Sequence, residues 1–298
     1  MLHVNFAAPL RKLRYKIWFL FIPIFKIKSG FGEISVKAIT PASRMLPYVL
    51  RKTWRLELMR RIFAFRSGVF IDVGANTGQT LFDYLESGSS CGYFGFEPNP
   101  ECVVLLNHIM QRNKLNNVSI IPAGFADGNT VLRLFVADKS DSDSGGSLIE
   151  DFRPKKQLNS LHVPVYRFDD IRDRLGIDKI SLIKIDTEGA ELVCLLGMKQ
   201  TLLTCRPWII VEVLHRDPHA DGTEYNKRLN EIVILIKAAG YCLNKIQKTK
   251  DESSIISLQL LDDFPRAVWS EENRHECDYL LTPSEEIADV QGLNFVSN

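Results

Sequence analysis

The feature that most restricts the fold of this chain is an alternation, from Gly68 onward, of short apolar runs with helical segments. Short runs rich in β-branched and aromatic residues are typical of buried strands. Strands that alternate with helices favour a mostly parallel sheet with helices on both faces. The strands expected on this basis are Val69–Val73, Gly92–Phe96, Val118–Pro122, Thr130–Val136, Ile180–Ile185, Trp208–Val213 and Asp278–Leu281.

Helices are expected between these strands, and one more helical segment precedes them. The expected helices are Gln79–Glu86, Glu101–Asn113, Glu191 to about Leu203, and Leu229–Ala239, and Met45–Phe65 also has apolar residues near helical spacing. The polar stretch Asp138–Gly146 is expected to form a mobile loop, either a lid over a site or an inert surface loop. We predict a basic, partly helical extension over residues 1–66 and an α/β domain over residues 67–298.

The first candidate binding motif is the segment VFIDVGANTG, residues 69–78. A buried strand ends in an acid, Asp72, and a glycine-rich turn then opens a helix, so that the backbone and the helix N-terminus can approach a ligand. The glycines are spaced GxxxG (Gly74 and Gly78), unlike the GxGxxG of dehydrogenases. A carboxylate here would repel a pyrophosphate and suits a cationic ligand. The alternative is a tight strand–helix turn with a capping acid.

The second motif is YFGFEPNP, residues 93–100, another strand that ends in an acid. Glu97 follows Asp72 by 25 residues, which is near the spacing at which nucleotide-binding folds grip a ribose diol. A carboxylate suits that role because it accepts hydrogen bonds from both hydroxyls. The alternative is an exposed glutamate that closes a strand.

The third motif is SLIKIDTEGAE, residues 181–191. Asp186 and Glu188 are expected at the carboxyl end of a strand, where ligands bind in open α/β sheets. Lys184 shares a strand face with Asp186, because side chains alternate along a strand. A purely structural charge cluster is the alternative.

The segments IDVGANTG, FGFEPNP and IKIDTEGAE, in this order and spacing, resemble the FkbM family of S-adenosylmethionine-dependent methyltransferases. The resemblance covers about Gly68 to His215, and VYRFDDI and PWIIVEV on either side of the third motif add to it. It implies an α/β, Rossmann-like class I methyltransferase fold with a mostly parallel seven-stranded sheet, helices on both faces, and S-adenosylmethionine as the cofactor.

The resemblance also assigns roles to residues at the strand ends. The methionine end of the cofactor would be wrapped by Asp72, Gly74, Asn76 and Gly78, and the ribose would be held by Glu97. The third strand is followed by AGFAD rather than directly by an acid, so Asp127 is the candidate for the adenine amine.

The resemblance further implies methyl transfer to a hydroxyl of a sugar, glycolipid or polyketide-type natural product. An alcohol needs a base near the methyl group, because it is a poor nucleophile until its proton is accepted. The candidates are Asp186, Glu188 and His215, the last of which titrates near neutral pH. Alternatively, Asp186, Glu188 and Glu212 hold a divalent cation that acidifies the hydroxyl.

Charge is distributed unevenly along the chain. Residues 1–66 contain fourteen lysines and arginines but only two acids, although the whole chain has a net charge of +1. Trp18–Phe25 is too short to span a bilayer, so it is either a core element or an aromatic, basic segment that contacts anionic lipid. Such contact would place the enzyme at the inner membrane face, with a lipid-linked glycan as a candidate acceptor.

Other functions remain as alternatives. A nucleic-acid methyltransferase would suit the basic N-terminus, but no NPPY-like or Pro-Cys motif is present, so nucleic acid is not the expected partner. A non-catalytic membrane-associated scaffold and a nicotinamide oxidoreductase are further alternatives, the latter disfavoured by the missing GxGxxG. The six cysteines form no CxxC pair, which indicates reduced thiols in a cytoplasmic protein without a zinc site.

Overall fold

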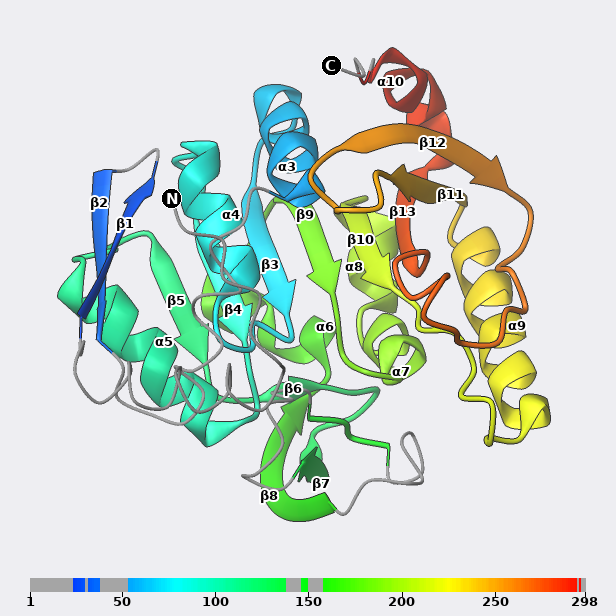
Figure 1. The fold of residues 1–298 in the computed structure, drawn as a ribbon, viewed down its shortest axis with the longest axis horizontal. Coiled ribbons are helices and arrows are strands. Elements are labelled where there is room, and N and C mark those ends of the chain that lie inside the picture. The colour runs from blue at the N-terminus through cyan, green and yellow to red at the C-terminus, as the bar shows by residue number, and fades with distance from the viewer. Residues whose placement is uncertain are drawn as a thin grey trace, which may run out of the picture.

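The central element of the computed structural model is an eight-stranded sheet with helices on both faces (Figure 1). The structure describes residues 24–29, 32–37, 53–137, 146–149, 158–293 and 295. The order of the strands is β12-β11-β13-β10-β9-β3-β4-β5. Their bounds are β3 (Val69–Val73), β4 (Tyr93–Phe96), β5 (Val118–Ile121), β9 (Ile180–Ile185), β10 (Trp208–Glu212), β11 (Tyr241–Lys248), β12 (Ile255–Leu261) and β13 (Asp278–Pro283).

Six of these strands run in one direction. Each neighbouring pair from β5 to β10 is parallel, whereas β13 is antiparallel to both β10 and β11, so β11 runs parallel to β10. The Rossmann-like class is therefore confirmed. The predicted count of seven is corrected to eight, because β12 forms an antiparallel hairpin with β11 and extends the edge.

The helices divide into two layers. One face of the sheet packs against α3 (Trp54–Phe65), α4 (Gln79–Ser87) and α5 (Pro100–Arg112), and the other against α7 (Glu191–Leu196), α8 (Lys199–Thr204) and α9 (Gly222–Ala238). Local sequence sets several helix ends. The side chain of Asn99 accepts a hydrogen bond from the N–H of Glu101 at the start of α5, and Asp221 caps α9 in the same way.

The predicted helix from Glu191 to about Leu203 is interrupted after α7. Gly197 lies at the break, where a Cβ atom would stand 2.1 Å from the carbonyl oxygen of Ala126. This close approach of two backbones allows only glycine, and α8 begins two residues later. The helix predicted from Leu229 begins earlier, at Gly222, because its first two turns are polar and lack the apolar signal.

A separate three-stranded sheet lies beyond the end of the large sheet toward which β3 and β9 point (Figure 1). It contains β6 (Gly124–Phe125), β7 (Thr130–Ala137) and β8 (Leu158–Tyr166). The strand predicted over Thr130–Val136 therefore exists but belongs to this small sheet. The short helices α6 (Phe168–Ile171) and η3 (Asp173–Leu175) lead back to β9.

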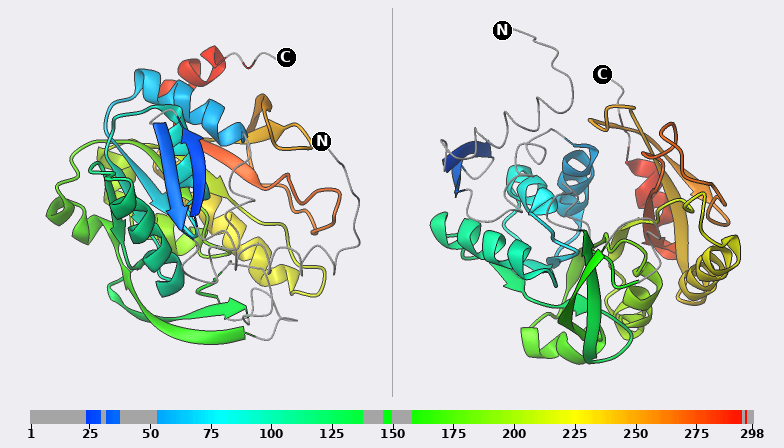
Figure 2. Two further views of the ribbon diagram at one scale, coloured as in Figure 1. Left: turned by 60° about the vertical axis from the view of Figure 1, so that its left-hand side comes forward. Right: turned by 60° about the horizontal axis from the view of Figure 1, so that its bottom comes forward.

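The remaining elements lie toward the two ends of the chain. The hairpin of β1 (Ile24–Ser29) and β2 (Gly32–Lys37) packs beside α5, where Asn113 bonds the backbone of Ser35 (Figure 2). η4 (Ser284–Glu286) and α10 (Ile287–Gly292) follow β13. In the part of the chain that is described, no helix has the length and apolar character needed to cross a membrane.

Three predictions for the N-terminal part and the polar loop fall partly outside the described residues. These are the segment Trp18–Phe25 up to residue 23, the helical pattern from Met45 up to residue 52, and the loop Asp138–Gly146 up to residue 145. The described part of the second segment is α3, whose Trp54, Leu58 and Ile62 are buried in the core of the large sheet. The domain boundary after residue 66 stays a prediction.

Candidate active site

Three parallel strands bring their carboxyl ends together at one pocket. β3 lies between β4 and β9, and the N–H groups of Gly74 and Asp186 bond to Phe96 and Val73 at 2.9 and 3.0 Å. The chain leaves β3 toward β4 on one side while β9 lies on the other, and such a switch point is where ligands bind in open α/β sheets. We call this the strand-end pocket.

The lining of the strand-end pocket combines predicted and unpredicted residues. The predicted residues in the lining are Gly74, Asn76, Glu97, Asp186 and Glu188. Lys184, Thr187 and Val73 come from the same strand ends. The other residues are supplied by α3, the start of α4, the connection from β4 to α5 and the region of the small sheet, and they are Arg55, Gln79, Thr80, Pro98, Gly124, Phe125, Leu134, Gly146 and Leu148.

The turn after β3 needs its glycines. Gly74 has φ +85°, and a Cβ atom there would stand 2.0 Å from the carbonyl oxygen of Asp186. Asn76 and Gly78 also have positive φ, at 49° and 97°. Gly78 is the N-cap of α4 and makes no side-chain cap, so the first-turn N–H groups of this helix remain available to a ligand.

Glu97 is held by two backbone hydrogen bonds just beyond β4. Its carboxylate oxygens accept from the N–H groups of Asn76 and Asn99, both at 2.7 Å. Burial raises the pKa of this carboxyl to about 7, although the two N–H donors oppose the shift. An ionised carboxylate has about four lone-pair sites, so Glu97 can still accept hydrogen bonds from a ligand diol.

Asp72 lies behind the pocket rather than in its lining. The side chain is fully buried, and its Oδ2 accepts a hydrogen bond of 2.5 Å from the hydroxyl of Tyr93. Its Oδ1 has no hydrogen-bond partner among the described residues. Burial raises the pKa of Asp72, and the charge of Lys184 counteracts that shift. Asp72 can therefore act on a ligand only through Lys184 or through the field it contributes.

Lys184 connects Asp72 to Asp186. The ammonium of Lys184 is buried and lies 2.8 Å from Oδ2 of Asp186, while the backbone pairs it with Asp72. Burial acts to lower the pKa of Lys184, but the charges of Asp186 and Asp72 outweigh it and raise the pKa. The lysine is therefore charged, and it orients a carboxylate at the pocket wall.

Asp186 and Glu212 form a pair of neighbouring acids whose pKa values are shifted in opposite directions. Burial acts to raise the pKa of Asp186, but Lys184 and a hydrogen bond from Glu212 lower it to about 2. The pKa of Glu212 is raised well above its ordinary value by burial and by the charges of Asp186 and Asp278. The opposite directions of the two shifts favour a proton on Glu212 over one on Asp186.

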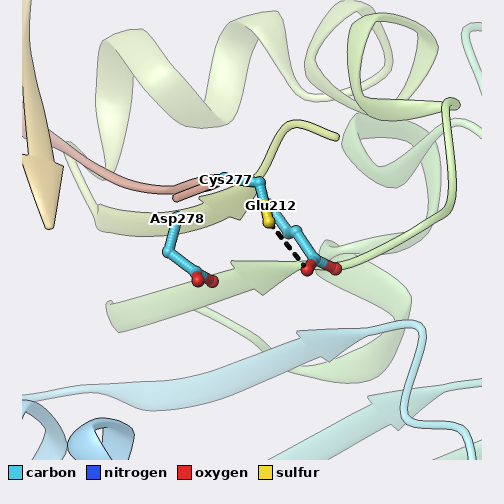
Figure 3. A group of neighbouring side chains, drawn as sticks. All are labelled: Glu212, Cys277 and Asp278. Atoms are coloured by element: carbon cyan, nitrogen blue, oxygen red, sulfur yellow. Dashed lines mark hydrogen bonds between the residues drawn. The ribbon is translucent and has the colours of Figure 1, made fainter. Parts of the chain in front are cut away.

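Glu212 also lies close to Cys277 and Asp278, and the three side chains are of types that can bind a metal ion (Figure 3). Their ligand atoms lie within 4.8 Å of one another, and Sγ of Cys277 donates to Glu212 at 3.3 Å. Lys248 donates to Asp278 and brings a positive charge to this group. Spacing in the sequence gave no sign of this cluster, because β10 and β13 meet only through antiparallel pairing.

Glu188 lies where the strand-end pocket meets a second cavity. Its backbone has φ 51°, which is uncommon for a residue with a side chain, and its carbonyl accepts a 2.8 Å hydrogen bond from Ser147. The second cavity, which we call the β10 cleft, extends from Glu188 past His215 to Trp269. Glu188 is thus the predicted catalytic residue that lines both cavities.

His215 and Asp127 lie outside the strand-end pocket. Nε2 of His215 lies 3.1 Å from the carbonyl oxygen of Asn273, and because a carbonyl only accepts, Nε2 carries the proton and Nδ1 is left as an acceptor. Burial lowers the pKa of His215, so the ring is neutral at pH 7. Asp127 is exposed and lines neither cavity. The roles assigned to both residues stay predictions.

Comparison with known proteins gives a family match across these motifs. Residues 72–243 match the family described as the methyltransferase FkbM domain. The 2-O-methyltransferase NoeI of Sinorhizobium fredii is 26% identical over 151 residues, which are 46% of this chain and 60% of that protein. The chain therefore spans less than two thirds of this curated relative.

Two solved structures match this chain at low identity and low TM-score. The methyltransferase FkbM from Methylobacillus flagellatus is 13% identical with a TM-score of 0.42, over 92% of this chain and 59% of that one. A SAM dependent methyltransferase from Aquifex aeolicus is 9% identical with a TM-score of 0.39, over 80% and 92% of the two chains. The match over residues 72–243 is therefore the comparison that bears on family membership.

Proposed function

This chain belongs to the FkbM methyltransferase family, and from that premise we propose that it transfers a methyl group from S-adenosylmethionine to a hydroxyl of a sugar, glycolipid or related natural product. The observation that carries the proposal is the strand-end pocket, where Glu97 and the glycine turn after β3 face the same cavity as Asp186. The name of the relative NoeI supports transfer to oxygen.

The donor and acceptor groups of the pocket fit this cofactor. Glu97 would accept hydrogen bonds from the ribose hydroxyls, and the first-turn N–H groups of α4 would bind the carboxylate of the methionine part. The ionised Asp186 would bind the ammonium group or offset the sulfonium charge. The apolar side chains of Phe125, Leu134 and Leu148 would cover the adenine.

When bound, the cofactor would supply an electrophilic methyl group, and the residues of the chain would position the acceptor and take its proton. Glu188 is our proposed base, because it lines both cavities and is held in a backbone conformation that few non-glycine residues adopt. Asp186 is a poor base, since Lys184 stabilises its ionised form. Its replacement by asparagine should therefore weaken cofactor binding more than the chemical step.

Titration calorimetry of the folded protein with S-adenosylmethionine tests the proposal. We expect binding that Glu97→Gln weakens strongly, because the amide places a donor against one of the two N–H groups that now bond to Glu97. Glu272→Gln is the matched control, since it also exchanges a glutamate for its amide but lies on the surface outside both cavities. Absence of binding to a folded wild-type protein would overturn the proposal.

The divalent-cation alternative is tested with the same protein in a methyl-transfer assay. If Asp186, Glu188 and Glu212 hold a required cation, chelation with EDTA abolishes turnover and added Mg²⁺ restores it. If Glu188 acts as a base without a cation, turnover survives EDTA and is lost in Glu188→Gln.

We also propose, from the sequence of residues 1–66, that the basic residues there that precede α3 bring the enzyme to anionic lipid. Each basic residue near such a surface contributes about 1 kcal/mol, so even some of them would give measurable binding. Flotation with phosphatidylserine vesicles at low salt tests this, and failure of the full-length chain to float would contradict it.

A further inference from the structure

The β10 cleft is the larger of the two cavities that meet at Glu188. It has a volume of about 940 Å³, within the range of small-molecule sites, and lies between α7, the segment after β10 and the first half of α9, with Trp269 also in its lining. Glu188 and Glu212 line it at its inner end. A molecule in this cleft would therefore lie beside the strand-end pocket that we assign to the cofactor.

The outer wall of the cleft is tied to β10 by backbone hydrogen bonds. The N–H of Arg216 donates to Ala267 at 3.1 Å, and the N–H of Trp269 donates back to Arg216 at 2.9 Å. The side chain of Asn273 donates to the carbonyl of Val268 at 2.8 Å. These bonds position Trp269 on the wall before any ligand binds, which reduces the entropy lost on binding.

Trp269 offers an aromatic surface to the cleft. Its side chain is 41% exposed, which is high for a tryptophan in a cavity lining, and Tyr225 lines the same cleft. Aromatic rings with a polar atom suit ligands that have both an apolar face and hydroxyl groups. The ring of a sugar has this character, because its C–H groups gather on one face and its hydroxyls lie at the edge.

The charges of the lining are predominantly negative. Six carboxyl side chains line the cleft, compared with three basic side chains. Two of the basic groups are engaged with the protein itself, since Arg216 donates to Ala220 at 2.8 Å and Arg228 donates to Gly189 at 3.1 Å. Burial and neighbouring acids raise the pKa of Glu212, but even without its charge the other five acids exceed the three bases. An anionic ligand would therefore be repelled.

We infer that the β10 cleft is the acceptor site, in which Trp269 packs against the apolar face of a sugar ring and the acidic lining selects neutral or cationic acceptors over anionic ones. This inference rests on the proposed function for its location, since it takes the strand-end pocket as the cofactor site. Phosphorylated, sulfated and uronic-acid acceptors would be discriminated against by charge.

Saturation-transfer NMR with the full-length chain tests the inference with two matched probes. Methyl β-glucoside and methyl β-glucuronide differ by one carboxylate, and we expect transfer to the ring protons of the glucoside and weaker transfer to the glucuronide. Trp269→Ala should weaken glucoside binding roughly two- to tenfold. Val268→Ala is the control, because Val268 is equally exposed but does not line the cleft.

A charge reversal tests the selectivity separately. Glu231→Lys, on the exposed side of α9, should shift the ratio of the two affinities toward the glucuronide by roughly two- to fivefold. The inference is overturned if neither probe shows transfer, if the glucuronide binds wild type as well as the glucoside, or if Trp269→Ala has no effect. Calorimetry with S-adenosylmethionine on the same samples is independent of these results, so failure of the cofactor site would be distinguished from failure of the acceptor site.

Discussion

The two faces of the central sheet differ in chemical character at its carboxyl edge. The face toward α7, α8 and α9 is apolar throughout, with Ile183, Ile185 and Val211 at alternate strand positions. The opposite face begins with the apolar residues Phe70, Leu182 and Ile210, but toward the strand ends the same alternation carries ionisable residues, which are Asp72, Lys184, Glu212 and Asp278. One face therefore stabilises the sheet, and the other brings charge to the ligand edge.

This difference shows how the fold accommodates buried charge. A buried ion costs several kcal/mol unless it is paired, so each acid on the charged face has a cation or a donor near it. Lys184 is the cation near Asp72 and Asp186, and Lys248 is the cation paired with Asp278. Ionisable groups clustered in this way at a strand edge are typical of functional sites rather than of a stability core.

The largest effect on stability is expected from Lys184→Met, which removes the cation of the charged face near Asp72 and Asp186. Removal of the ammonium leaves Asp72 and Asp186 without their shared cation, and the loss of one partner from a buried pair typically costs about 3–5 kcal/mol. We expect the free energy of unfolding, measured in urea, to fall by about this amount. Adding Asp72→Asn to the variant should restore part of the loss. A single variant as stable as wild type would show that the lysine does not stabilise the acids.

A pH-dependent effect is expected from Glu212→Gln. The pKa of Glu212 is raised in the folded protein, so the native state binds a proton that the unfolded state releases above about pH 4.5. Wild-type stability therefore falls as the pH rises above that value, by at most about 1.4 kcal/mol per unit from this group. Glutamine keeps a hydrogen-bond donor and removes the titration. The variant should gain stability relative to wild type between pH 5 and 8, and a constant difference in unfolding free energy would contradict this.

A smaller effect is expected on cofactor affinity through Glu97. Its pKa of about 7 means that the carboxylate is mostly protonated at pH 6 and mostly ionised at pH 8. Hydroxyl donors bind the ionised form better, so the dissociation constant for S-adenosylmethionine should fall by up to about tenfold over this range. Calorimetry at pH 6, 7 and 8 measures it. Glu272→Gln, on the surface outside both cavities, should keep the slope, whereas Glu97→Gln should bind weakly with no slope.

The sequence was sufficient to predict the parallel half of the fold. β3, β4, β9 and β10 were predicted to within a residue or two, because each is a short apolar run next to a helical pattern. In the antiparallel edge, β13 was predicted as Asp278–Leu281, but β11 and β12 were not, since they are half-exposed strands in which polar and apolar residues mix. β11 pairs with β12 in a hairpin and joins the rest of the sheet through β13, which begins thirty residues after β11 ends.

Prediction of the site had a similar limit. Glu97 and Asp186 could be placed beside one pocket from the sequence, because acids at the ends of parallel strands lie at one edge of the sheet. Arg55, which also lines that pocket, and Trp269, which lines the β10 cleft, could not be placed there because each comes from a distant part of the chain with no motif of its own. The roles of these residues in binding stay predictions. The sequence also placed Asp72 in the binding lining, whereas the structure buries it behind Lys184. Distance from the ligand cannot be read from strand register alone.

The smallest effect is expected on the apolar face, from Ile183→Val. Ile183 is fully buried and precedes Lys184 in the chain, but it points to the opposite side of the sheet. Variants at these two positions therefore compare the two faces of the same strand. Loss of one methylene there should lower the free energy of unfolding by about 0.5–1.5 kcal/mol, equally at pH 5 and pH 8, with unchanged affinity for S-adenosylmethionine. Ile185→Val is the matched comparison, because it makes the same change on the same face of β9, two residues nearer the pocket. If either variant changed the pH dependence of stability or weakened cofactor binding, packing on the apolar face would have to set the positions of Lys184 and Asp186. The two faces would then not act separately, one in stability and the other in ligand binding.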